Sequence, residues 1–283
     1  MTCTRAQESV PEETAGGRSN PATALSASIE GAGPDLLLIH GLSAHRGEWD
    51  DVTRLMRDRF RVVCPDLAGR GVSSAGAEDR FGLRSEVARL SAFADAVEVR
   101  RPIVVGHSQG AALAVALCAR RPCKALLLVN PVTPWTPRPP VLGLLKYELV
   151  RQAVAPVLRH YRRPLTRYIL TRRVYADPAR ATEDAVTRYS GALASPERSH
   201  TLARVLADWR PSELEAYDRP AGVPVHVLTG GLDRRVPAAT ARRWSDRLGG
   251  PCTVLEDCAH GVPEEAPDRV VELILELDRI SSA

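Results

Sequence analysis

Several features that would place a protein in a class at once are absent from this sequence of 283 residues. It has no run of 18 apolar residues, so no membrane span is expected. It has no Cys-x-x-Cys among its six cysteines, and no histidine pair has zinc-ligand spacing, so a zinc site is not indicated. Neither a metal nor an organic cofactor is expected. Lysine occurs only at Lys124 and Lys146, and the net charge of +4 does not indicate a nucleic-acid-binding protein.

The start of the chain lacks the basic beginning and the apolar centre of a secretory signal. Residues 1–24 are polar and are predicted to form a flexible tail. Cys64 and Cys118 fall in apolar runs and are expected to be small core residues in a reduced compartment. A Cys252–Cys258 disulfide remains an alternative. Together these features predict a cytoplasmic protein, either a monomer or a homodimer.

Short apolar runs alternate with helical patterns over most of the chain. Strands are predicted at residues 36–40, 61–64, 103–106, 126–130, 225–229 and 253–255, with a further edge strand at 26–29. Helices are predicted at residues 49–57, 83–98, 111–120, 238–248 and 268–280. In the last of these, Val270, Ile274 and Leu277 share one face. This alternation predicts the α/β class, with a mostly parallel, doubly wound sheet.

The pattern breaks at residues 135–210, which contain no convincing strand. Helical runs at 141–158 and 198–209 are punctuated by four prolines: Pro156, Pro164, Pro178 and Pro196. The segment has 14 basic and 6 acidic residues, so it is net +8 in a chain that is net +4. We interpret residues 135–210 as a helical cap inserted between two parts of one core domain, residues 25–134 and 211–283.

The most informative stretch runs from residue 104 to residue 112 and contains Gly106-His107-Ser108-Gln109-Gly110. An apolar run precedes it and a run of small and apolar residues follows. This context predicts a buried strand, a tight turn and a buried helix, with Ser108 at the tip as a nucleophile. The two glycines allow strand and helix to approach without a clash of Cβ atoms. The alternative is a serine in an ordinary strand-to-helix turn.

A serine hydroxyl needs a base, and the base needs a group that orients it. His260 is the candidate base, on a loop between a short strand and the last helix. His107 is expected to point away, and His226 lies inside a strand. Asp233 follows a strand and is the candidate acid, which would orient the imidazole. The alternatives are a surface histidine and a turn aspartate.

The oxyanion that forms during attack needs two donors. We expect the backbone N–H groups of Gln109, directly after the nucleophile, and of Leu42, in the turn after the first central strand. His40 is expected to brace that turn. His45 and Trp49 follow it and are candidate substrate contacts.

At this point the chain resembles the α/β-hydrolase superfamily over roughly residues 25–280. The matching motifs are Leu38-Ile39-His40-Gly41, Asp66-Leu67-Ala68-Gly69-Arg70-Gly71-Val72-Ser73, Gly106-His107-Ser108-Gln109-Gly110, Gly231-Leu232-Asp233 and Ala259-His260-Gly261. The resemblance implies that Ser108, Asp233 and His260 form a catalytic triad and that the Asp66 turn is structural. Arg70 stands where many members have histidine, which is taken as neutral, and the usual pair of opening strands is not evident.

The sequence therefore predicts a serine hydrolase that cleaves a carboxylic ester or thioester of a small molecule. A carbon–carbon or amide hydrolase, an acyltransferase and a non-catalytic binding protein remain alternatives. Arginines of the cap favour either an anionic substrate or a solvated basic face, and weak attraction to a membrane surface is a third possibility. These arginines are Arg159, Arg162, Arg163, Arg167, Arg172 and Arg173.

Overall fold

A seven-stranded sheet forms the centre of the computed structural model, which describes residues 25–76 and 78–282. The strands lie in the order β1-β3-β2-β4-β5-β6-β7, and only β1 is antiparallel to its neighbour. All seven predicted strands are present, with ends shifted by at most one residue. Their bounds are β1 Ala27–Glu30, β2 Asp35–Ile39, β3 Arg61–Pro65, β4 Ile103–His107, β5 Ala125–Val129, β6 Val225–Gly230 and β7 Cys252–Leu255.

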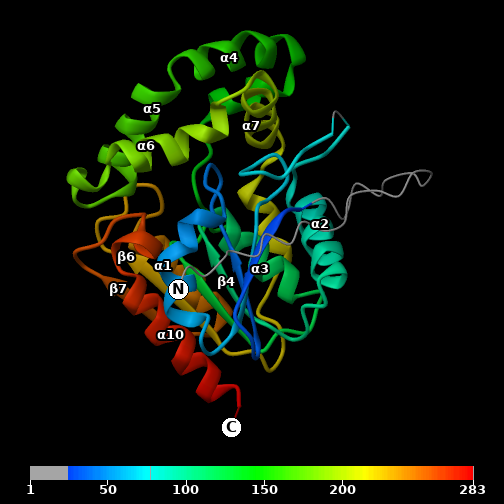
Figure 1. Cartoon of the computed structure of the whole chain (residues 1–283), viewed down its shortest axis with the longest axis vertical. Helices are drawn as coiled ribbons and strands as arrows, with labels where there is room; N and C mark the ends of the chain where they lie inside the picture. Colours follow the sequence, from blue (N-terminus) through cyan, green and yellow to red (C-terminus); the bar gives the residue numbers. More distant parts are fainter. Residues whose placement is uncertain (1–24, 77, 283) are drawn as a thin grey trace, which may run out of the picture.

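Helices cover both faces of the sheet, as predicted for a doubly wound fold. α1 and α10 lie on one face, and α2 and α3 lie on the other (Figure 1). The helices of this core region are α1 Asp50–Met56, α2 Leu83–Ala96, α3 Gln109–Cys118, α8 Ala238–Leu248, α9 Val262–Glu265 and α10 Pro267–Ile280. The predicted face of the last helix is confirmed, since Val270, Ile274 and Leu277 are all buried against the sheet.

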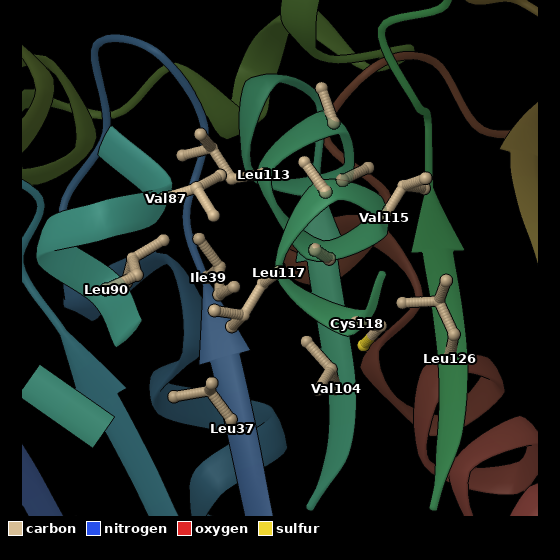
Figure 2. Packing of buried hydrophobic residues seen from close by; sticks show 14 of the residues in the cluster. Leu37, Ile39, Val87, Leu90, Val104, Leu113, Val115, Leu117, Cys118 and Leu126 are labelled. Carbon is tan, nitrogen blue, oxygen red and sulfur yellow. The ribbon is translucent and has the colours of Figure 1, made fainter. Parts of the chain in front are cut away.

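The strand residues alternate between two hydrophobic cores. Leu37 and Ile39 of β2 face the α2–α3 side, whereas Leu36 and Leu38 face the α1–α10 side. Figure 2 shows the first core, in which Leu113 and Leu117 of α3 pack over β2 and β4, beside Val87 and Leu90 of α2. Burying a side chain of this size contributes about 1.5–3 kcal/mol, so these layers fix the height and direction of each strand end.

Residues 135–210 form a helical segment above the carboxyl end of the sheet (Figure 1). Its elements are the 3-10 helix η3 Pro140–Lys146, α4 Glu148–His160, α5 Arg162–Ile169, the π-helical turn η4 Leu170–Val174, η5 Pro178–Arg180, α6 Glu183–Ser190, η6 Gly191–Leu193 and α7 Pro196–Asp208. The prediction of one helix over 141–158 is wrong, because Tyr147 is extended and separates η3 from α4. Pro156 lies inside α4 without ending it.

Two smaller sequence predictions can also be compared with the structure. Cys64 and Cys118 are buried, as expected, but Cys252 and Cys258 are both free, so the alternative disulfide is not formed.

Only one strand, β1, precedes Asp35 in the described part of the chain. Among residues 25–76 and 78–282, no helix is long and apolar enough to span a bilayer. The predicted tail at residues 1–24 lies outside the described residues.

Candidate active site

The direction of winding reverses between β2 and β4, which are neighbours in the sheet. The chain leaves β2 towards β3 on one side and leaves β4 towards β5 on the other. The two loops therefore separate, and this opens a crevice at the carboxyl ends of the strands, where ligands bind in sheets of this kind. Leu42 follows β2 and Ser108 follows β4, so the sheet topology itself brings these two residues to the crevice.

Ser108 occupies a sharp turn between β4 and α3. Its φ of 53° and ψ of −115° are unfavourable for a residue with a Cβ atom and cost about 1–3 kcal/mol. Its N–H donates to the Val129 carbonyl at 2.9 Å, which anchors the turn to β5. The flanking glycines are required by contact, since a Cβ on Gly106 would lie 2.3 Å from the Gly110 oxygen and one on Gly110 would lie 2.2 Å from the Ile39 oxygen.

The structure brings Ser108, His260 and Asp233 together although they come from three separate loops. Asp233 Oδ2 lies 2.7 Å from His260 Nδ1, and because a carboxylate only accepts, this nitrogen carries a proton. His260 Nε2 is then the acceptor, and the Ser108 hydroxyl donates to it at 3.0 Å. All three side chains are buried. This chain of hydrogen bonds is the arrangement needed to activate a serine hydroxyl.

The Asp233 carboxylate accepts three further hydrogen bonds. Its Oδ1 accepts from the N–H groups of Arg235 at 2.7 Å and Val236 at 3.0 Å. Its Oδ2 also accepts from the Asn130 amide at 2.9 Å. Burial opposes ionisation, but His260 and the two backbone donors outweigh it and lower the pKa of Asp233. Asp233 is therefore ionised at neutral pH and keeps the His260 ring in one orientation.

His260 itself is kept in its neutral form. Burial is the largest cause that lowers the pKa of His260, and the nearby His107 adds to it, against the opposing charge of Asp233. A pKa below 6.5 leaves the imidazole free to accept a proton at neutral pH.

Two functional residues, Asn130 and Glu48, were missed by sequence reasoning. Asn130 has a φ of 43° directly after β5 and donates to both Asp233 and the Ala259 carbonyl, at 2.9 and 3.1 Å. It therefore ties the acid to the loop of His260. A polar residue at the end of a buried strand, at the same edge as Ser108, was the available signal.

Glu48 forms a buried pair with His107, behind the His260 ring. Glu48 Oε1 lies 2.9 Å from His107 Nδ1, and His107 Nε2 lies 2.8 Å from the His260 carbonyl oxygen. Both partners are acceptors, so both ring nitrogens donate and His107 is an imidazolium. Burial alone would lower the pKa of His107, but the Glu48 carboxylate and the His260 carbonyl raise it. As expected, His107 is directed away from a role as base.

The turn after β2 lies against the nucleophile. A Cβ on Gly41 would lie 3.2 Å from His107 Nδ1 and 3.4 Å from Ser108 Cβ, so the turn passes close to the nucleophile. The Gly41 N–H donates to Glu48 Oε2 at 3.0 Å. Within the described residues, neither the Leu42 N–H nor the Gln109 N–H donates to a loop carbonyl or a side chain. The two N–H groups therefore have no such acceptor in this part of the structure, and Leu42 and Gln109 remain the predicted oxyanion donors. His40 braces the turn as expected, bonding the Gly41 carbonyl and the Leu67 N–H.

Arg70 is not the neutral replacement that the sequence suggested. Its buried guanidinium forms an ion pair with Glu86 at 3.2 Å and donates to Gln109 Oε1 at 3.1 Å. It also reaches the Leu42 carbonyl at 3.5 Å. Arg70 therefore contacts both residues that are predicted to supply the oxyanion donors, and it orients the Gln109 side-chain amide.

Two cavities meet at Ser108 and His260. The first has a volume of about 220 Å³ and is lined mainly by apolar side chains of the helical segment. These are Leu158, Leu165, Ile169, Leu170, Val174, Leu193, Leu202 and Leu206. The second has a volume of about 350 Å³ and lies between η3, the end of α7 and the loop after β6. Leu42, Leu206 and Arg235 border both cavities.

The two candidate substrate contacts are not found at these cavities. Trp49 ends the 3-10 helix η2 Arg46–Trp49 and is fully buried in the core beneath α1 and α10, so it cannot touch a substrate. His45 lines a separate cavity, and its Nδ1 accepts from the Gly47 N–H at 3.1 Å. His45 is the N-cap of η2.

Comparison with known proteins is consistent with this geometry. The sequence model of the alpha/beta hydrolase family matches residues 36–273. The magnesium-chelatase 30 kDa subunit of Rhodobacter capsulatus is 28% identical over 258 residues, which cover 86% of each chain. The pimeloyl-[acyl-carrier protein] methyl ester esterase of Nitrosomonas europaea is 29% identical over 252 residues, which cover 85% of this chain and 94% of that protein.

Solved structures agree on the fold. An alpha/beta hydrolase fold protein from Burkholderia ambifaria superposes with a TM-score of 0.79 at 24% identity, over 89% of this chain and 93% of that one. A thermophilic esterase from Thermogutta terrifontis superposes with a TM-score of 0.74 at 22% identity, over 92% and 94% of the two chains.

Proposed function

The chain belongs to the alpha/beta hydrolase family, and from this premise we propose that it is a serine hydrolase that cleaves a carboxylic ester or thioester of a small molecule. The observation that carries the proposal is the hydrogen-bonded chain from Ser108 through His260 to Asp233, open to two cavities. The esterase relative of Nitrosomonas europaea supports the same reaction class.

Acylation would begin with attack of Ser108 Oγ on the substrate carbonyl carbon while His260 Nε2 takes the hydroxyl proton. The carbonyl oxygen becomes an oxyanion, which accepts from the Leu42 and Gln109 N–H groups. As the tetrahedral intermediate collapses, the bond to the leaving oxygen or sulfur breaks. That atom takes the proton from His260, and the acyl group remains on Ser108. Asp233 stabilises the imidazolium throughout but does not take the proton.

Deacylation would use the same groups with water in place of the leaving group. His260 Nε2 takes a proton from the water as its oxygen attacks the acyl carbon. The bond to Ser108 Oγ then breaks, His260 returns the proton to Ser108, and the carboxylic acid leaves. The two donors bind the oxyanion again, so one site serves both steps.

We further propose that residues 135–210 act as the cap of this site. Six of its elements, α4, α5, η4, α6, η6 and α7, contribute side chains to the apolar cavity beside Ser108. The side chains that would surround the reacting ester on that side therefore come from the helical segment rather than from the sheet. The cytoplasmic location and the oligomeric state, a monomer or a homodimer, remain predictions from the sequence.

Labelling with a fluorophosphonate probe tests the proposal, because only an activated serine forms the covalent adduct. We expect the wild type to be labelled at Ser108 and to hydrolyse short acyl esters. Ser108→Ala should abolish labelling and lower kcat by several orders of magnitude with an unchanged melting temperature. Ester hydrolysis that survives in purified Ser108→Ala would refute the role of Ser108. Ser73→Ala is a control, since Ser73 lies in the Asp66 turn and bonds the Asp66 carbonyl.

A second candidate function is a non-hydrolytic role as a subunit of a larger assembly. It is suggested by the relative named as a magnesium-chelatase subunit. A wild-type protein that is neither labelled nor active on esters, thioesters, amides and carbon–carbon substrates would favour it. The intact Ser108–His260 hydrogen bond favours hydrolysis, because a purely structural subunit has no use for a base against the serine.

A further inference from the structure

The second cavity at Ser108 has an unusual charge. Four arginines line it, Arg138, Arg173, Arg234 and Arg235, and its lining includes no aspartate or glutamate. The apolar cavity on the other side of Ser108 has a single arginine, Arg235, at the junction of the two. The two sides of the candidate reaction centre therefore differ strongly in charge.

Three of these arginines have no partner for their guanidinium groups among the described residues. Arg173, Arg234 and Arg235 form no side-chain hydrogen bond and no ion pair there. Other arginines of the helical segment do form ion pairs: Arg163 and Arg167 both pair with Glu183. Arg138 is the exception in the cavity, because it donates to the Leu142 and Leu206 carbonyls at 3.1 and 2.9 Å. Three of the four guanidinium groups at the cavity are thus unpaired in the described part of the chain.

Arg235 connects this charge to the reacting groups. Its N–H holds Asp233 Oδ1 at 2.7 Å, and its side chain borders both cavities beside Ser108 and His260. Surrounding protein and the charge of Arg173 lower the pKa of Arg235, against the opposing effect of Asp233. The Arg173 and Arg235 guanidinium groups repel each other, and a carboxylate or a phosphate, either of which accepts two parallel N–H bonds from one guanidinium, is the ligand that they bind best.

We propose that the substrate has an apolar arm on one side of its scissile carbonyl and an anionic group, a carboxylate or a phosphate, on the other, bound by Arg173, Arg234 and Arg235. The inference rests on the proposed function, because it places the scissile bond at Ser108. Of the six cap arginines that the sequence indicated, only Arg173 reaches the cavity, and the other two ligands come from the loop after β6.

Matched esters test the proposal. The hexanoyl esters of 3-hydroxypropanoate and of 2-hydroxyethyl phosphate carry the anion on the alcohol arm, and 3-hydroxypropanamide hexanoate is their neutral match. Monohexyl succinate and its amide place the anion on the acyl arm. We expect kcat/KM to favour the anionic member of at least one pair by tenfold or more. The favoured pair identifies the arm, and the two alcohol-arm probes distinguish carboxylate from phosphate.

Arg173→Gln and Arg234→Gln should each reduce that anionic-to-neutral ratio by about tenfold, because each removes one charge-assisted contact. Arg172→Gln is the matched control, since Arg172 is the exposed neighbour of Arg173 and lines neither cavity; its ratio should match the wild type. Raising the salt concentration should also reduce the wild-type ratio.

Two failures can be told apart. If the wild type hydrolyses neutral and anionic esters equally well, or if Arg172→Gln lowers the ratio as much as Arg173→Gln, the anionic-arm proposal is wrong and the serine hydrolase stands. If no ester is hydrolysed and the fluorophosphonate probe does not label Ser108, the proposed function itself fails.

Discussion

The sheet core and the helical segment 135–210 bury their apolar residues to very different degrees. In β2, β4 and β5 every apolar residue is buried, with at most 1% of its surface exposed. Ten large apolar side chains are exposed in the described part of the chain, and seven of them lie between residues 141 and 168: Val141, Leu144, Tyr147, Leu149, Val157, Tyr161 and Tyr168. Packing therefore fixes the core closely, whereas the segment is held by smaller clusters.

The same two regions also use arginine differently. Arg70 and Arg89 of the core region share Glu86, with Arg70 only 2% exposed, and Arg70 also donates to the Gln109 side chain and the Leu42 carbonyl. Arg173 of the helical segment has no such partner and faces a cavity. The core thus positions the reacting groups, and we propose that the segment selects what reaches them. Changes in the core should affect rate and stability together, and changes in the segment should affect substrate choice.

The largest expected effect comes from Asp233→Asn in the core. The amide would donate to His260 Nδ1, so the imidazole would adopt the wrong tautomer and could no longer accept from Ser108. We expect kcat to fall by about 10⁴-fold with little change in KM, measured by steady-state ester hydrolysis. Asp257→Asn, on the exposed loop before Cys258, is the control and should retain wild-type kcat. A loss below tenfold in Asp233→Asn would mean that another group orients His260.

The difference between the regions also explains what could be predicted from the sequence. Strand ends were predicted to within one residue because each buried run is bounded by Gly, Pro or charged residues. In the helical segment, apolar residues lie on exposed as well as buried faces, so periodicity does not mark the break at Tyr147 or the separate helices α5 and α6. Glu48 and Asn130 could not be paired with His107 and Asp233 by any motif, since 59 and 103 residues separate them.

A second core variant, Arg70→Met, tests the link between rate and stability. It leaves Glu86 with one ion-pair partner in a buried site, which should lower the free energy of unfolding by about 3–5 kcal/mol. It also removes the contacts to Gln109 and Leu42, so kcat should fall at temperatures where the variant is folded. Denaturant unfolding measures the free energy of unfolding, and ester hydrolysis by the same preparation measures kcat. Arg46→Met, which removes a partly exposed 3.6 Å pair with Asp66, should cost about 1 kcal/mol or less.

Ile169→Trp tests the other half of the comparison. Ile169 lines the apolar cavity of about 220 Å³, and an indole would fill part of that space. We expect the ratio of kcat/KM for hexanoyl over acetyl esters to fall by about tenfold, with the acetyl rate largely kept. Tyr168→Trp is the matched control, because Tyr168 is 58% exposed and outside the cavity. An equal loss on both esters would show that the segment positions the reacting groups as well.

Glu48→Gln should have a smaller effect, visible mainly in the pH profile. The wild-type acid limb of kcat/KM should lie below pH 6.5, because burial and His107 lower the pKa of His260. Without the Glu48 carboxylate, the pKa of His107 falls, and its positive charge beside His260 is lost at neutral pH. The pKa of His260 then rises, so the acid limb should move to higher pH.

The pH profile of Glu48→Gln has its own control. Glu272→Gln, at an exposed pair with Arg269 on α10, removes the same charge far from the crevice and should leave the acid limb in place. A shift of the acid limb to lower pH in Glu48→Gln would contradict the charge assigned to His107.

The smallest effect on stability is expected from a substitution on the exposed face of α4, in contrast to the same substitution in the buried sheet. Leu149 of α4 is 79% exposed, so Leu149→Ala should change the free energy of unfolding by no more than about 0.5 kcal/mol. Leu38→Ala, the same change at a fully buried position of β2, should cost about 2–5 kcal/mol. Chemical denaturation of both variants measures the contrast. If Leu149→Ala destabilised the protein as much as Leu38→Ala, the exposed face of α4 would be covered in solution, and the helical segment would be as closely packed as the core.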